Sequence, residues 1–205
     1  MAAERAVICA VVAEMAVVRP ELAEASSSAV EACWSERDFP VYDSDARAKA
    51  LYDTDADLRN KLMAMFGTHV YKDGHVCRRV LAEAVFDNPE QLQRLNALVH
   101  PAVFRDFERW CREQTAAAVF VESAILLQTD FRRYTNRVLV VDAPVEVRLR
   151  RVAQRDATTS EAVAKRMAEQ MASADMRAKA DWIVENDDSQ SVITQVMAFV
   201  NTLQA

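Results

Sequence analysis

Arginine is concentrated in one short stretch of the second half of the chain. Five arginines fall within nineteen residues, 148–166. Three of them, Arg148, Arg151 and Arg155, recur at the spacing that stacks side chains along one face of a helix. Guanidinium groups match phosphate oxygens and stay charged at every pH, so this face suits a polyphosphate. The pattern also fits a solvated helix face whose arginines pair with neighbouring acidic side chains.

An acidic turn follows the first clear strand. Residues 39–42 form an apolar run that predicts a short buried strand, and it leads directly into Asp43-Ser44-Asp45. In open α/β sheets, ligands bind at the carboxyl ends of the strands. The sequence therefore places this polar turn where an α/β protein binds its ligand.

Glycine is almost absent. The chain contains 2 glycines, Gly67 and Gly74, where average usage would give about 14. Loops that cradle phosphate need glycine for the close approach of their backbone, so no glycine-rich phosphate loop can be written on this sequence. Any nucleotide must be bound without the glycine-cradled anion site that most nucleotide-binding proteins use.

Composition excludes several classes of protein. Lys and Arg number 25 against 31 Asp and Glu, a net charge of −6 over 205 residues, so nucleic-acid binding has no general electrostatic support. The longest apolar stretch, residues 6–18, is interrupted by Glu14 and is too short to span a membrane. The four cysteines show no metal-ligand spacing and fit reduced thiols. These features predict a cytoplasmic protein with no secretory signal, no membrane partner and no nucleic-acid partner.

The second half of the chain alternates strands and helices. Strands are expected over residues 116–121, 137–141 and 182–184, because their unalternating apolar character is typical of parallel strands covered on both faces. Helices are expected between and after them, over residues 103–113, 145–154, 160–171 and 190–203. The alternation predicts an α/β fold with a parallel sheet.

The first half is expected to be mainly helical. Residues 1–35 should form one or two helices, although residues 10–12 and 16–18 also fit short strands. A turn is expected at Lys72-Asp73-Gly74. Further helices are expected over residues 46–52, 55–66, 78–86 and 89–99, the last beginning at an Asn88 cap.

Six segments from residue 39 onward resemble the dephospho-coenzyme A (dephospho-CoA) kinase family, in the family's order. They are VYDSDARAK (41–49), LVHP (98–101), FVESAIL (120–126), RVAQRD (151–156), RMAEQ (166–170) and ADWIVEN (180–186). Six matches over about four-fifths of the chain argue against a chance similarity.

The resemblance implies an α/β fold of the P-loop kinase type. Its parallel sheet would be flanked by helices in a single kinase-like domain over residues 1–205. Residues 1–35 would be atypical, residues 55–113 would form a helical coenzyme-binding region, and residues 145–180 would contain a lid. The implied reaction uses ATP and Mg²⁺ and transfers the γ-phosphoryl group to the ribose 3′-hydroxyl of dephospho-CoA, which yields coenzyme A.

The resemblance also implies roles for single residues. Asp45 matches the carboxylate beside the acceptor hydroxyl, where it can accept the proton and lie near Mg²⁺; the alternative is that it caps the helix ahead of Ala46. Asp43 would support the acceptor site. His100 would start a helix or orient the substrate, and the alternative is plain packing; Asn186 also fits a simple turn. The full set comprises acceptor-side Asp43, Asp45, His100 and Glu122, phosphate and lid residues Arg151, Arg155 and Arg166, and Asn186 near the adenine ring.

The N-terminal segment departs from the family. The family's glycine-rich Walker A loop, which ends in Lys-Ser/Thr, should fall at residues 21–29, where Ser26, Ser27 and Ser28 stand instead. Ser27 occupies the lysine position, while Ser28 could still offer a hydroxyl to Mg²⁺. Because phosphoryl transfer depends on positioning and charge stabilisation, ATP binding is doubtful and the kinase should be strongly impaired.

Three interpretations remain open. The chain could be an impaired kinase derivative that still binds dephospho-CoA or coenzyme A. It could instead be a working kinase whose first 35 residues are altered by a frameshift or a misassigned start. The third interpretation is a stable α/β interaction protein that binds neither ligand.

Overall fold

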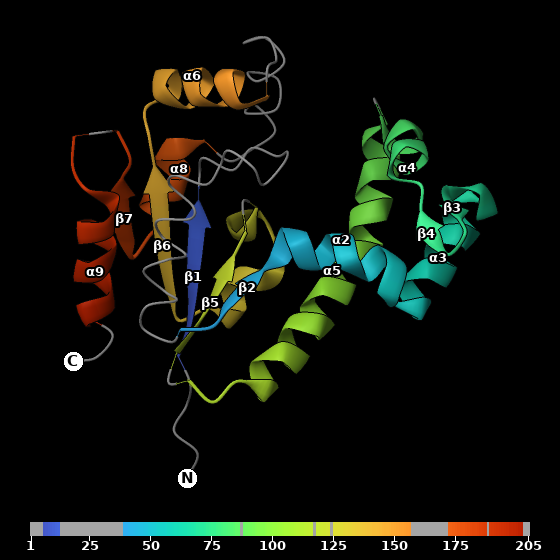
Figure 1. Ribbon diagram of the computed structural model, residues 1–205, viewed down its shortest axis with the longest axis horizontal. Helices are drawn as coiled ribbons and strands as arrows, with labels where there is room; N and C mark the ends of the chain where they lie inside the picture. The colour runs from blue at the N-terminus through green and yellow to red at the C-terminus, as the bar shows by residue number, and fades with distance from the viewer. Residues whose placement is uncertain are drawn as a thin grey trace. The chain divides into compact units, whose positions relative to one another are not determined.

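The computed structural model describes residues 6–12, 39–86, 88–116, 118–123, 125–156, 172–187 and 189–202, with the backbone alone at 6–12, 130 and 153–156. The chain divides into two compact units, one formed by residues 1–42 and 114–205 and the other by residues 43–113. Figure 1 shows the elements of each unit. The helix expected over residues 160–171 and the alternatives at 16–18 lie outside the described residues.

The first unit is built on a five-stranded sheet. The strands are β1 (Ala6–Val12), β2 (Val41–Asp43), β5 (Ala118–Glu122), β6 (Arg137–Asp142) and β7 (Trp182–Glu185), and they stand in the order β2-β5-β1-β6-β7. β1 is parallel to β5 on one side and to β6 on the other. β7 is parallel to β6 and forms one edge of the sheet.

Burial explains why these segments are strands. All five residues of β5 are buried, and so are the last five residues of β6. Buried backbone amides and carbonyls need hydrogen-bond partners, and neighbouring parallel strands supply them on both sides. The strands expected from the unalternating apolar runs are confirmed, with ends that differ by no more than two residues.

The central strand corrects the sequence analysis. Residues 6–12 form β1, and the expectation of helix is wrong for this segment. Apolar periodicity cannot separate a strand from a buried helix in so short a run. Pairing decides between them, because Cys9 is in register with Val121 of β5 and with Val138 of β6. The alternative of a strand over residues 10–12 is confirmed as part of this longer strand.

Helices complete the first unit. α6 (Val145–Asp156), α8 (Ser173–Ala178) and α9 (Val192–Thr202) follow strands β6 and β7, with two short 3₁₀ helices, η3 (Leu126–Gln128) and η4 (Asp130–Tyr134), before β6. α9 lies beside β7 and α6 lies beyond the carboxyl end of β6 (Figure 1). Apolar side chains of α9 and of three strands form one buried cluster: Phe120, Leu139, Val141, Val184, Val196, Phe199 and Val200.

The second unit is mainly helical, as expected. It contains α2 (Ser44–Thr54), α3 (Ala56–Phe66), η2 (Thr68–Val70), the hairpin strands β3 (Tyr71–Lys72) and β4 (His75–Val76), α4 (Arg78–Val85) and α5 (Pro89–Glu113). The expected turn is confirmed as the tip of the hairpin, where Asp73 and Gly74 both have positive φ (51° and 84°). That combination is typical of the two-residue turns that join antiparallel strands.

α5 is longer than the sequence indicates. Helices were expected over residues 89–99 and 103–113, but a single helix of 25 residues spans both, with Pro101 inside it. Proline removes the amide that would donate to the carbonyl of residue 97, at a cost of about 3 kcal/mol. Burial of Val99, Ala102 and Val103 around the proline offsets that cost. The cap at Asn88 is confirmed, because its Oδ1 accepts a hydrogen bond from the Gln91 amide at 3.1 Å.

Candidate functional site

Buried polar side chains collect at the carboxyl ends of the parallel strands. Glu122 ends β5, Asp142 ends β6 and Asn186 follows β7, and each is no more than 6% exposed. From the central strand β1 the chain goes to β2 at one edge of the sheet and then to β5, which lies between them. The next strand, β6, lies on the other side of β1. The direction of strand order therefore reverses next to β1, and such reversals mark the ligand crevice of open α/β sheets.

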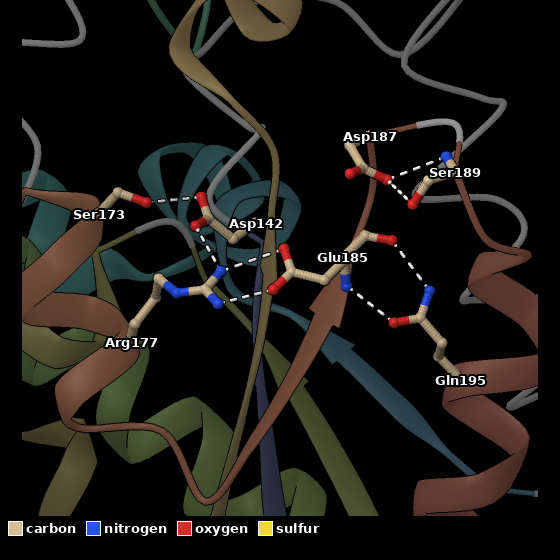
Figure 2. A network of polar contacts seen from close by, with 7 residues as sticks. All are labelled: Asp142, Ser173, Arg177, Glu185, Asp187, Ser189 and Gln195. Carbon is tan, nitrogen blue, oxygen red and sulfur yellow. Dashed lines mark hydrogen bonds and ion pairs between the residues drawn. The ribbon is translucent and has the colours of Figure 1, made fainter.

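One guanidinium joins the ends of β6 and β7 to helix α8. Arg177 donates to Glu185 at 2.6 and 3.1 Å and to Asp142 at 3.0 Å, and Ser173 donates to the other oxygen of Asp142 at 2.6 Å (Figure 2). Hydrogen bonds to Glu185 and then to Asp142 raise the pKa of Arg177. Both carboxylates are therefore engaged in holding α8 against the strand ends.

A side-chain amide pairs with the backbone of the edge strand. The Gln195 Nε2 amide donates to the Glu185 carbonyl and its Oε1 accepts from the Glu185 amide, both at 2.9 Å (Figure 2). In the next loop, Asp187 accepts hydrogen bonds from the hydroxyl and amide of Ser189, and these bonds lower the pKa of Asp187. The end of β7 is thus fixed by two local networks.

Two residues with separate predicted roles lie together. Arg151 Nη1 on α6 donates to the carbonyl of Asn186 at 3.0 Å, and the Asn186 amide donates to the carbonyl of Asp142 at 2.7 Å. The phosphate-side arginine and the residue expected near the adenine ring are therefore linked through the backbone. The contact fixes α6 relative to the loop that follows β7.

In the second unit, the side chains of Asp43 and Asp45 have different roles. Asp43 Oδ1 accepts hydrogen bonds from the amides of Asp45 and Ala46, both at 2.9 Å, so Asp43 is the N-cap of α2. The alternative that Asp45 caps this helix is wrong. Asp45 lies in the first turn, where burial and then the Asp43 carboxylate raise its pKa and Lys49 lowers it in part. A half-buried carboxylate of raised pKa suits a proton acceptor.

His100 lies inside α5, so the expected position at a helix start is wrong. Its side chain is half-buried, and burial lowers the pKa of its imidazole. The ring is therefore neutral near pH 7 and can accept or donate a hydrogen bond without carrying charge.

A carboxylate that the sequence analysis missed ties α2 to α5. Asp106 is 3% exposed and accepts from Arg47 Nε at 2.7 Å and Arg47 Nη2 at 2.8 Å, and it also pairs with Arg109. Paired N–H donors match the two oxygens of a carboxylate. The only signal in the sequence was an aspartate on the otherwise apolar face of α5.

Several predicted positions fall outside the described residues. They are Ser26, Ser27, Ser28, Arg166 and the side chain of Arg155. Within the described ranges, no three His, Cys, Asp or Glu side chains are grouped as a metal site would need. No described helix is long and apolar enough to cross a membrane.

Comparisons with known proteins identify the family and the fold. The family model for dephospho-CoA kinase (CoaE) matches residues 24–191. The dephospho-CoA kinase of Porphyromonas gingivalis is 34% identical over 167 residues, which cover 81% of this chain and 83% of that protein. A Thermus thermophilus crystal structure superposes with a TM-score of 0.80 at 27% identity and 98% coverage of both chains. The dephospho-CoA kinase of Campylobacter jejuni, at 20% identity, TM-score 0.67 and 96% coverage of both, shares the fold. The fold is that of the P-loop kinases, and the chain belongs to the dephospho-CoA kinase family.

Proposed function

We propose that this protein transfers the γ-phosphoryl group of ATP to the ribose 3′-hydroxyl of dephospho-CoA, at a rate well below that of an ordinary kinase. The observation that carries the proposal is the Asp45 carboxylate, which is half-buried and has a raised pKa. Asp45 lies two residues past the end of β2. Family membership supports the choice of substrates.

Asp45 would accept the proton of the attacking hydroxyl. Its raised pKa strengthens the carboxylate as a base, and the Asp43 cap holds its backbone in the first turn of α2. Proton removal from the 3′-hydroxyl frees an oxygen lone pair that attacks the γ-phosphorus, and the bond to the β-phosphate oxygen breaks. His100 and Glu122 are proposed as further acceptor-side residues because each matches a motif of the family.

The residues present fit a magnesium ion that is held mainly by its substrate. Mg²⁺ is commonly bound through one or two carboxylates, substrate phosphates and water, and Asp45 supplies one carboxylate. Ser28 would add a hydroxyl. When bound, the ion would neutralise charge on the phosphates. Arg151, Arg155 and Arg166 would add positive charge from α6 and the lid.

The reduced rate follows from the residues at the expected Walker A positions. Ser26, Ser27 and Ser28 offer neither the glycines nor the lysine of that loop. Loss of one positively charged stabiliser costs a factor of about 10²–10³ by comparison with single oxyanion-hole donors. The same observation favours a second candidate, a protein that binds dephospho-CoA or coenzyme A without catalysis.

Formation of coenzyme A from dephospho-CoA and Mg-ATP tests the proposal. We expect turnover far below the roughly 1–100 s⁻¹ of typical kinases, and we expect Asp45→Asn to abolish it. Asp57→Asn, which removes an exposed carboxylate on α3, serves as the control and should leave the rate unchanged. Turnover within the ordinary range would contradict the predicted impairment.

Titration calorimetry separates the two candidates. Heat of binding for dephospho-CoA without any coenzyme A formation would favour the binding protein. No heat at millimolar dephospho-CoA would eliminate both candidates, because each requires an intact acceptor site.

A further inference from the structure

One buried positive charge in the first unit has no described counter-ion. Arg148 on α6 is 7% exposed, and its Nε has no hydrogen-bond partner. Among the residues that the structure describes, no carboxylate forms an ion pair with it. Because a guanidinium stays protonated at every accessible pH, it cannot escape the cost of burial by losing its charge.

The angular position of Arg148 places it on the face of α6 that packs against the rest of the first unit. Arg151 and Val152 lie three and four residues later, so they flank Arg148 on the helix surface by about 60° on one side and about 40° on the other. Arg151 contacts the Asn186 carbonyl, and Val152 is 3% exposed. Arg148 therefore lies between a residue of α6 that contacts the loop after β7 and a residue of α6 that is buried in the first unit.

The carboxylates at the ends of β5, β6 and β7 are already engaged. Asp142 and Glu185 accept from Arg177, and Asp142 also accepts from Ser173. Glu122, at the end of β5, also takes part in a contact of its own. Arg148 is therefore a buried cation in the first unit that none of these carboxylates at the strand ends neutralises.

A second arginine with a buried Nε shows how the fold compensates such a charge elsewhere. Arg59 also has a buried Nε without a partner, but its Nη2 donates to the Asp53 carbonyl and its guanidinium lies 5.7 Å from the centre of the Tyr71 ring. Both contacts stabilise the charge. No such contact is present for Arg148 within the described residues.

We propose that Arg148 binds a phosphoryl oxygen of the nucleoside triphosphate and supplies, from α6, part of the positive charge that is missing at Ser27. The inference rests on the proposed function for the identity of the anion. Guanidinium and phosphate form charge-assisted hydrogen bonds that gain strength when water is excluded. An anion at this position gives the buried charge its partner.

Binding of Mg-ATP and of inorganic tripolyphosphate, measured by calorimetry, tests the inference. Arg148→Gln should weaken both by about tenfold or more, and Arg148→Lys should restore part of the affinity. Arg150→Gln removes the same charge from the exposed side of the same helix and should change affinity by less than about twofold. Equal affinity in Arg148→Gln and the parent protein overturns the inference, as does the absence of any binding of either probe to the parent protein.

Melting without ligand distinguishes a phosphate-binding residue from a structural one. Arg148→Met removes an uncompensated buried charge and keeps the bulk of the side chain, so the melting temperature should stay the same or rise. A lower melting temperature would show that Arg148 stabilises the fold and would overturn the inference. Coenzyme A formation is scored separately, so a parent protein that binds tripolyphosphate through Arg148 but forms no product would overturn only the proposed reaction.

Discussion

His100 makes the stability of the protein depend on pH. Burial lowers the pKa of the folded imidazole below the unfolded value of about 6.5. Below that value the unfolded chain takes up a proton that the folded chain does not, so stability falls as the pH drops through the unfolded pKa towards the folded one. His100→Gln should therefore show a shallower loss of stability between pH 7 and pH 5 in urea unfolding.

An exposed histidine provides the matched control. His69→Gln changes a histidine of the same unit that is exposed to solvent, and it should keep the pH dependence of the parent protein. Identical slopes for His100→Gln and the parent protein would show that burial of His100 does not contribute to the pH dependence.

At the residue scale, motifs indicated single residues but not the partners of their side chains. The sequence indicated Asp45, Arg151 and Asn186 because each lies in a short matching segment. It did not indicate that Asp43 would cap α2, because either aspartate of the turn could take that place. The pairing of Arg47 with Asp106 joins residues 59 positions apart, and no local pattern specifies such a distance.

Helix α8 should depend on one side chain for its attachment. It has 6 residues, and an isolated helix of that length does not form in water. Arg177→Met removes the bonds to Asp142 and Glu185, and because the arginine side chain is 37% exposed, we expect a loss of about 1–3 kcal/mol in the free energy of unfolding. Hydrogen exchange of the α8 amides should become faster than in Arg150→Met.

A double-mutant cycle identifies the contact responsible. If Arg177 acts through Glu185, Glu185→Gln should add little to the effect of Arg177→Met. Additive losses would show that the two side chains act independently.

At the scale of elements, the sequence predicted strands better than it predicted where helices end. Unalternating apolar runs specify β5 and β6, because both faces of these strands are buried, and the same pattern indicated β7, which is only partly buried. Pro101 suggested a helix boundary, but α5 continues past the proline because the residues around it are buried and stabilise the helix. β1 was ambiguous because seven apolar residues fit either structure until the neighbouring strands are known.

For the whole molecule, ligand binding should appear as added stability. A ligand that binds only the folded chain stabilises it by about 2.7 kcal/mol at a concentration 100 times its Kd. For a protein of this size that corresponds to a rise of roughly 5–11 °C in melting temperature. We expect dephospho-CoA to produce such a rise and Mg-ATP a smaller one. No rise with either ligand would leave the protein as an α/β scaffold that binds neither.

The place of β1 has a consequence for how the chain is made. Ala6 pairs with Ala118, 112 residues later (118 − 6), and β1 also needs β6, which is made later still. At about 5–20 residues per second, the ribosome takes roughly 6–22 s to produce the first of these partners. During that time the apolar segment of β1 has no strand to pair with, and it is exposed to chaperones and to other nascent chains. Because pairing between distant segments also folds slowly, the yield of folded protein should be set by the protection of residues 6–12 during synthesis.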